Sequence, residues 1–176
     1  MKERVEVLIS AADVDKRVAQ MAEEIGRDYA GKEIFMICIL KGSVIFMSEL
    51  AKKLNHEVTF NFMKVSSYGN STESCGRIKI DMDLDEHIKG KDVLIIEDIV
   101  DTGRTLKHLK DLLSLREPAS LKLCTLLDKP DRRVADVEAD YTGFVIPDDF
   151  VVGYGLDYAQ RYRNLDYIGV LRFDEE

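Results

Sequence analysis

Apolar residues recur at helical spacing in three stretches of the chain, and each stretch predicts a helix. The first helix has Asp13 as its candidate N-cap and Gly31 as its stop signal, with an apolar face made of Val14, Val18, Met21, Ile25 and Tyr29. Ser43 is the candidate N-cap of a second helix, whose apolar residues are Ile45, Phe46, Leu50 and Leu54. A third helix is expected around residues 106–113, before Pro118.

Other stretches predict strands. Continuous apolar runs are typical of strands buried on both faces, and the chain has three of them: Ile34–Leu40, Val93–Ile96 and Leu121–Leu127. Two further strands, Val58–Val65 and Ile78–Leu84, alternate apolar with polar residues. Because buried strands alternate with helices, we expect residues 1–176 to form a single α/β domain with a central, mainly parallel sheet flanked by helices.

Two segments lack these patterns. Residues 66–76 are rich in Ser, Gly, Asn and Thr, and a long loop of this kind in a compact domain is often a functional, mobile lid. Residues 128–176 contain short strands and turns without a long helix. We expect this last part to form an appendage over the edge of the sheet.

Composition and charge narrow the possible functions. The chain has 176 residues, 45% apolar and 33% charged, which fits one globular domain. A formal net charge of -8 argues against sequence-independent binding to nucleic acid or to an anionic membrane. The longest wholly apolar run is too short to span a bilayer, and no secretory signal opens the chain. An odd set of separated cysteines favours the reducing cytoplasm: Cys38, Cys75 and Cys124.

The segment Val93–Leu106 contains the residues best suited to binding or catalysis. A buried strand leads to three carboxylates, Glu97, Asp98 and Asp101, and then to small and hydroxylated residues before a helix. Ligands of open α/β sheets bind at this end of the strands, and free N–H groups at a helix N-terminus suit a phosphate. Neighbouring carboxylates can accept hydrogen bonds from a sugar diol, so the segment could bind a ribose 5-phosphate. Taken singly, the same residues could be turn and cap residues without a ligand.

This segment resembles the 5-phosphoribosyl-1-pyrophosphate (PRPP) motif of the type I phosphoribosyltransferases. Further residues resemble the 6-oxopurine branch of that family, the hypoxanthine-guanine phosphoribosyltransferases: Leu40–Ser43, Ser67–Gly69, Lys129, Phe150, Val151, Asp157 and Arg163. The resemblance covers nearly the whole chain and implies that residues 128–176 contribute a small purine-binding hood over the C-terminal ends of the strands. It implies purine salvage, in which N9 of hypoxanthine or guanine displaces pyrophosphate from PRPP with the help of Mg²⁺, giving IMP or GMP.

The resemblance also implies a role for each residue. The ribose and 5′-phosphate of PRPP would be bound by Glu97, Asp98, Asp101, Thr102, Gly103, Arg104 and Thr105. Pyrophosphate would be bound by Lys41, Gly42 and Arg163, and the purine by Lys129, Phe150, Val151 and Asp157. Asp101 would be the catalytic acid or base at purine N7, and Mg²⁺ would be held by Glu97, Asp98 and Asp157. Ser67 and Tyr68 would begin the lid, in which Cys75 stands where the family commonly has a serine.

Two alternatives stay open. The first is an enzyme that prefers xanthine, because Lys129 would read the 6-oxo group that hypoxanthine, guanine and xanthine share. The second is a non-catalytic PRPP- or nucleotide-binding regulator, which would need a basic nucleic-acid face that this acidic chain lacks. We therefore expect an enzyme whose partners are PRPP and a 6-oxopurine, and neither nucleic acid nor a membrane. The resemblance further implies a homodimer or homotetramer.

Overall fold

The computed structural model describes residues 2–67 and 78–174, and for Lys2, Ser67 and Asp174 it describes the backbone alone. Within these residues the elements are, in chain order, β1 (Lys2–Ile9), α1 (Ala11–Asp28), β2 (Ile34–Ile39), α2 (Val44–Lys53), β3 (Val58–Ser67), β4 (Ile78–Met82), β5 (Asp92–Val100), α3 (Arg104–Ser114), β6 (Ser120–Asp128), the 3₁₀ helix η1 (Pro130–Arg132), β7 (Tyr141–Val145), β8 (Val151–Val152) and β9 (Ile168–Asp174). None of the helices in this described part is long and apolar enough to cross a bilayer.

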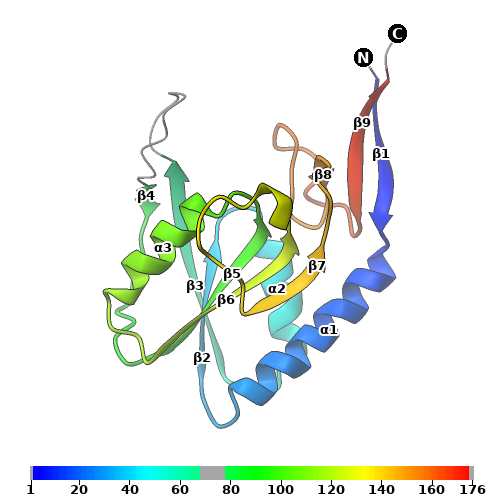
Figure 1. The fold of residues 1–176 in the computed structure, drawn as a ribbon. Helices are drawn as coiled ribbons and strands as arrows, with labels where there is room; N and C mark the ends of the chain where they lie inside the picture. The colour runs from blue at the N-terminus through cyan, green and yellow to red at the C-terminus, as the bar shows by residue number, and fades with distance from the viewer. Residues whose placement is uncertain (1, 68–77, 175–176) are drawn as a thin grey trace.

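A six-stranded sheet forms the centre of the molecule, with the strand order β4-β3-β2-β5-β6-β7. Its strands are parallel except for β4, which pairs with β3 in the antiparallel direction. Helices α1 and α2 lie on one face and α3 on the other (Figure 1). Along β2, Met36 and Cys38 belong to the core under α1 and α2, whereas Phe35 and Ile37 belong to the core under α3. The predicted α/β architecture is therefore confirmed, and burial on both faces explains why β2 is continuously apolar.

The smaller sheet has three antiparallel strands in the order β1-β9-β8 and holds both ends of the chain (Figure 1). With the loops around β8 it makes up the hood, but its composition differs from the prediction in two respects. β7 lies within residues 128–176 and yet joins the large sheet. β1 was not predicted, because charged Glu3, Arg4 and Glu6 interrupt its apolar pattern and its partner β9 lies at the far end of the sequence.

The N-cap of the first helix differs from the prediction, whereas that of the second helix is the predicted residue. The N-cap of α1 is Ser10 rather than Asp13, because the Ser10 Oγ accepts a hydrogen bond from the Asp13 backbone N–H (3.2 Å). Asp13 lies in the first turn, where its negative charge interacts favourably with the helix dipole. Ser43 is the N-cap residue of α2, as predicted, but its hydroxyl donates to the Ile39 carbonyl (2.5 Å) and forms no side-chain cap hydrogen bond.

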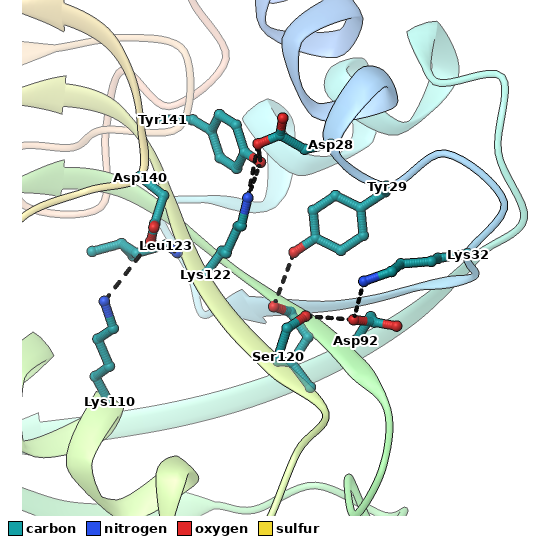
Figure 2. Close-up of polar contacts among 11 residues, drawn as sticks. Asp28, Tyr29, Lys32, Asp92, Lys110, Ser120, Lys122, Leu123, Asp140 and Tyr141 are labelled. Carbon is teal, nitrogen blue, oxygen red and sulfur yellow. Dashed lines mark hydrogen bonds and ion pairs between the residues drawn. The ribbon is translucent and has the colours of Figure 1, made fainter.

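Polar contacts fasten the N-terminal ends of the parallel strands to the end of α1 (Figure 2). Asp28 accepts hydrogen bonds on Oδ2 from the Lys122 ammonium (2.7 Å) and the Tyr141 hydroxyl (2.5 Å). The hydrogen bond from Lys122, followed by that from Tyr141, lowers the pKa of Asp28. This cluster connects α1 to the N-terminal ends of β6 and β7, whereas the predicted site lies at the C-terminal ends of the strands.

Candidate active site

β5 carries the first two predicted carboxylates, and it continues past the predicted end at Ile96 because Val100 still pairs with Asp128 of β6. Glu97 and Asp98 are half-buried, and the Ile99 backbone N–H donates to Asp98 Oδ1 (2.7 Å). Burial raises the pKa of Glu97 well above its ordinary value, and the negative charge of Asp98 raises it further. Burial also raises the pKa of Asp98. Hydroxyl donors or a cation would relieve this crowding of acidic groups.

The turn after β5 leads into the N-terminus of α3. Gly103 is the N-cap of α3 and has a φ of 77°, a left-handed conformation that favours glycine. Arg104 and Thr105 open the helix. A cavity of about 150 Å³ is lined here by Glu97, Asp101, Thr102, Gly103 and Thr105, among others. Its wall therefore combines backbone N–H groups of a helix start with threonine side chains, a combination that suits a phosphate group.

The loop Leu40–Ser43 connects β2 to α2 and packs between β5 and the hood. The peptide bond Leu40–Lys41 is cis. A Cβ added to Gly42 would overlap the carboxylate of Asp98, and a Cβ added to Gly155 would overlap the Gly42 carbonyl. Glycine is therefore required at position 42 for the loop to approach Asp98, and at position 155 for the segment after β8 to approach the loop.

The segment after β8 brings a second cation to the same loop. Arg163 donates through Nη1 to the Gly155 carbonyl (2.7 Å) and pairs through Nη2 with Asp157 Oδ1 (2.8 Å). Lys41 Nζ and Arg163 Nη2 both donate to Gln160 Oε1, at 3.2 and 3.4 Å. The two positively charged residues predicted to bind pyrophosphate thus converge on one neutral oxygen. Gln160 was not among the predicted site residues, since one glutamine in a loop carries no pattern.

A second group of residues lies where η1 faces the loop before β8. Lys129 is only 8% exposed, and its Nζ donates to the Asp149 carbonyl (2.6 Å) and lies 3.5 Å from Asp148 Oδ1. Asp101 accepts a hydrogen bond on Oδ1 from Arg132 Nε (3.1 Å). Arg132 Nη1 also donates to Asp148 Oδ2 (3.3 Å). Neither Arg132 nor Asp148 was singled out from the sequence.

The other predicted residues have less direct positions. Phe150 is 54% exposed and makes a T-shaped contact with Tyr158, with ring centroids 5.8 Å apart, so part of its ring is open to solvent. Val151 is buried and pairs with Val170, so only its backbone could contact a ligand. Ser67 ends β3, while Tyr68, Cys75 and most of the predicted lid lie outside the described residues.

The predicted metal ligands come from two segments of the chain. Asp157 Oδ2 accepts the Gln160 backbone N–H (2.8 Å) and its Oδ1 pairs with Arg163, whereas Glu97 and Asp98 lie together on β5. Among the described residues, no group of three or more His, Cys, Asp or Glu side chains is placed to hold a metal ion.

The comparisons with known proteins agree with this architecture. The family model of the phosphoribosyl transferase domain matches residues 10–159, and the chain therefore belongs to the phosphoribosyltransferase family. It is an enzyme of the transferase class.

Individual relatives narrow the family to one branch. The hypoxanthine phosphoribosyltransferase of Salmonella typhimurium is 50% identical over 180 aligned residues, which cover 99% of this chain and 100% of that protein. The hypoxanthine-guanine phosphoribosyltransferase of Streptococcus pneumoniae is 51% identical over 166 residues, covering 94% of this chain and 92% of that protein. A crystal structure of a hypoxanthine phosphoribosyltransferase from Staphylococcus aureus matches with a TM-score of 0.92 at 51% identity, covering 95% of this chain and 91% of that one. The resemblance to the hypoxanthine-guanine branch is thereby confirmed.

Proposed function

We propose that the protein transfers the 5-phosphoribosyl group from PRPP to N9 of hypoxanthine or guanine, forming IMP or GMP and releasing pyrophosphate. The observation that carries this proposal is the position of β5 and its turn between two cationic groups. Lys41 follows β2 and Lys129 follows β6, the two strands that flank β5, and Arg163 joins Lys41 through Gln160. A phosphorylated sugar bound at the turn would thus have its leaving group and its purine partner on opposite sides.

The sugar and the leaving group are matched by the residues around β5. Backbone N–H groups at the start of α3, with Thr102 and Thr105, would bind the 5′-phosphate. The reacting ribose becomes oxocarbenium-like, and Glu97 and Asp98 would accept hydrogen bonds from its hydroxyls. Pyrophosphate oxygens would replace Gln160 Oε1 between Lys41 and Arg163, whose guanidinium can make forked contacts with phosphate.

The purine is matched by the group around η1. Lys129 would donate a hydrogen bond to the 6-oxo group, and adenine would be rejected because its amino group offers no acceptor to the buried ammonium. Phe150 would stack on the base, and backbone carbonyls near Val151 and Asp157 would contact the C2 side. Asp101 would accept the N7 proton as N9 bonds to C1 of the ribose.

We propose Mg²⁺ as the cofactor, held by Glu97 and Asp98 with a contribution from Asp157. Mg²⁺ is commonly bound through one or two carboxylates together with water and substrate phosphates, and the paired acids of β5 fit that donor set. Asp157 would share its carboxylate with Arg163 and the Gln160 N–H, its present partners. When bound, the ion would neutralise part of the charge of the departing pyrophosphate.

We also propose that the protein is a cytoplasmic homodimer or homotetramer. Phe60 and Phe62 of β3 pair with residues of β2 that lie under α1 and α2, yet they remain 48% and 37% exposed. Met82 faces the same side, since it is the partner of Lys64 on β3, and it is 39% exposed. A second copy of the chain would cover this apolar face. Phe60→Ser should then lower the mass measured by light scattering, and an unchanged mass would argue against this contact.

A panel of bases tests the proposed reaction. The protein would be mixed with PRPP, Mg²⁺ and one base at a time: hypoxanthine, guanine, xanthine, adenine or uracil. We expect nucleotide from hypoxanthine or guanine and none from adenine or uracil. Faster use of xanthine would favour the xanthine-preferring alternative. PRPP binding without nucleotide from any base would favour the non-catalytic regulator.

A further inference from the structure

Asp101 and Lys129, which the proposed reaction needs at the purine, are connected by two side chains of opposite charge, Arg132 and Asp148. Asp101 pairs with Arg132 (Nε to Oδ1, 3.1 Å), and Arg132 pairs with Asp148 (Nη1 to Oδ2, 3.3 Å). Asp148 in turn lies 3.5 Å from Lys129 Nζ through its other oxygen, Oδ1. The base-reading ammonium and the proton-accepting carboxylate are therefore joined through Arg132 and Asp148.

The backbone fixes where Arg132 begins. It ends the 3₁₀ helix that directly follows Lys129, and its backbone N–H donates to the Lys129 carbonyl (3.1 Å). The next residue, Arg133, donates through Nε to the backbone carbonyl of Asp101 (3.1 Å) and pairs with Asp128. Consecutive arginines thus hold Asp101 by its side chain and by its main chain.

These contacts leave one carboxylate oxygen of Asp101 and one ammonium hydrogen of Lys129 available to a ligand. Arg132 engages Asp101 Oδ1, and no hydrogen bond from the described residues reaches Oδ2. Lys129 has three ammonium hydrogens, of which one is directed to the Asp149 carbonyl and one toward Asp148. The third hydrogen is left for a ligand. The group therefore presents one donor and one carboxylate oxygen at a separation set by Arg132 and Asp148.

A donor and an acceptor of this kind are chemically complementary to one edge of a 6-oxopurine that carries its proton on N7, on which O6 and N7 lie side by side. We propose that Arg132 and Asp148 are positioning residues that fix the distance between Lys129 and Asp101, so that a base bound through O6 has N7 at Asp101. In the reaction the N9 lone pair forms the bond to C1, the bond from C1 to pyrophosphate breaks, and the N7 proton passes to Asp101. This inference rests on the proposed function and adds two residues to it.

The test compares Arg132→Met, Asp148→Asn and the double variant with wild type, using steady-state rates. Misplacing a reacting group by a fraction of an ångström to one ångström costs on the order of tenfold to a hundredfold in rate. We therefore expect Arg132→Met to lower kcat at least about tenfold while KM for PRPP stays within about twofold. Asp148→Asn should raise KM for hypoxanthine. The double variant should be no slower than Arg132→Met, because residues that act as a unit are not additive.

Arg116→Met is the matched control, since Arg116 forms a comparable pair with Asp83 (2.7 Å) outside the site and should leave kcat unchanged. Arg132→Lys keeps the charge but lacks the second donor nitrogen, so its kcat should lie between those of wild type and Arg132→Met. An unchanged kcat in Arg132→Met, or losses that multiply in the double variant, would overturn the inference. Asp101→Asn is measured in parallel. If it loses kcat while Arg132→Met does not, the proposed reaction stands and only the bridge fails, whereas a wild type that converts no base refutes both.

Discussion

Replacing Lys129 by methionine should weaken the use of the base while leaving the binding of PRPP unchanged, so it tests the two kinds of recognition separately. The Lys129 side chain is only 8% exposed, and methionine has a similar length, so Lys129→Met keeps most of the packing while removing the ammonium. Asp148 keeps its contact with Arg132 (3.3 Å) and is half-exposed, so no buried unpaired charge is left behind. The expected effect therefore comes from the missing hydrogen bond to the purine and from the Asp149 carbonyl, which loses its donor.

The magnitude follows from the kind of hydrogen bond that is lost. A hydrogen bond to a charged group contributes about 1.5–3 kcal/mol, and at about 1.36 kcal/mol per factor of ten this is roughly a 10- to 150-fold loss in kcat/KM for hypoxanthine. KM for PRPP should stay within about twofold, because the hydrogen bonds of the Lys129 side chain within the described part of the chain go to Asp148 and Asp149, neither of which is assigned to the sugar or the pyrophosphate. The orphaned Asp149 carbonyl should also lower the free energy of unfolding by about 1 kcal/mol.

The assay varies hypoxanthine at saturating PRPP and then PRPP at saturating hypoxanthine, with thermal unfolding measured on the same samples. Lys107→Met is the control, since it removes an exposed lysine paired with Asp111 on α3 and should leave both constants unchanged. Equal losses for hypoxanthine and PRPP would show that Lys129 supports the whole site. Unchanged use of hypoxanthine would remove Lys129 from recognition of the base.

Three further predictions concern other parts of the molecule. Asp101→Asn should keep PRPP binding, measured by calorimetry, while kcat falls on the order of a hundredfold or more; an unchanged kcat would exclude Asp101 from proton transfer. Gly155→Ala should lower kcat/KM on the order of a hundredfold, because its Cβ would displace the 40–43 loop, whereas Gly90→Ala, also at positive φ but with open space, should affect stability alone. Asp28→Asn should lower the melting temperature at pH 7, since the hydrogen bond from Lys122 holds the pKa of Asp28 below its ordinary value of 3.8. That deficit should shrink as the pH falls below 3.8 and through the folded-state pKa, where wild type loses the same contribution; a deficit that is constant with pH would contradict it.

The turn between β5 and α3 could be predicted from the sequence because its signals are local. A buried apolar strand, adjacent carboxylates and a glycine-containing turn before a helix all fall within Val93–Leu106. The strand nevertheless extends to Val100, since pairing with β6 continues past the point where the apolar run ends. Local pattern gave the order of the elements, and tertiary pairing decided where they stop.

The contacts that join the two halves of the site could not be predicted in this way. Arg132 and Gln160 matter because of what lies opposite them in space. No local pattern marks Arg132 among the 25 lysines and arginines of the sequence, or Gln160 within its loop. The N-cap of α1 shows the same difficulty at short range, because Ser10 and Asp13 are both good caps and only the geometry selects Ser10.

The first strand illustrates how far such contacts reach. Glu3 of β1 accepts hydrogen bonds from Arg161 Nη2 (2.7 Å) and from the Tyr162 hydroxyl (2.6 Å). These two residues directly precede Arg163 and follow Gln160, so the N-terminal strand holds the segment that carries the proposed pyrophosphate ligands. Tyr162 has a φ of 75°, a conformation that costs free energy in a residue other than glycine and therefore needs such outside support. The three-stranded sheet thus closes the hood and also fixes the loop on which binding of the leaving group depends.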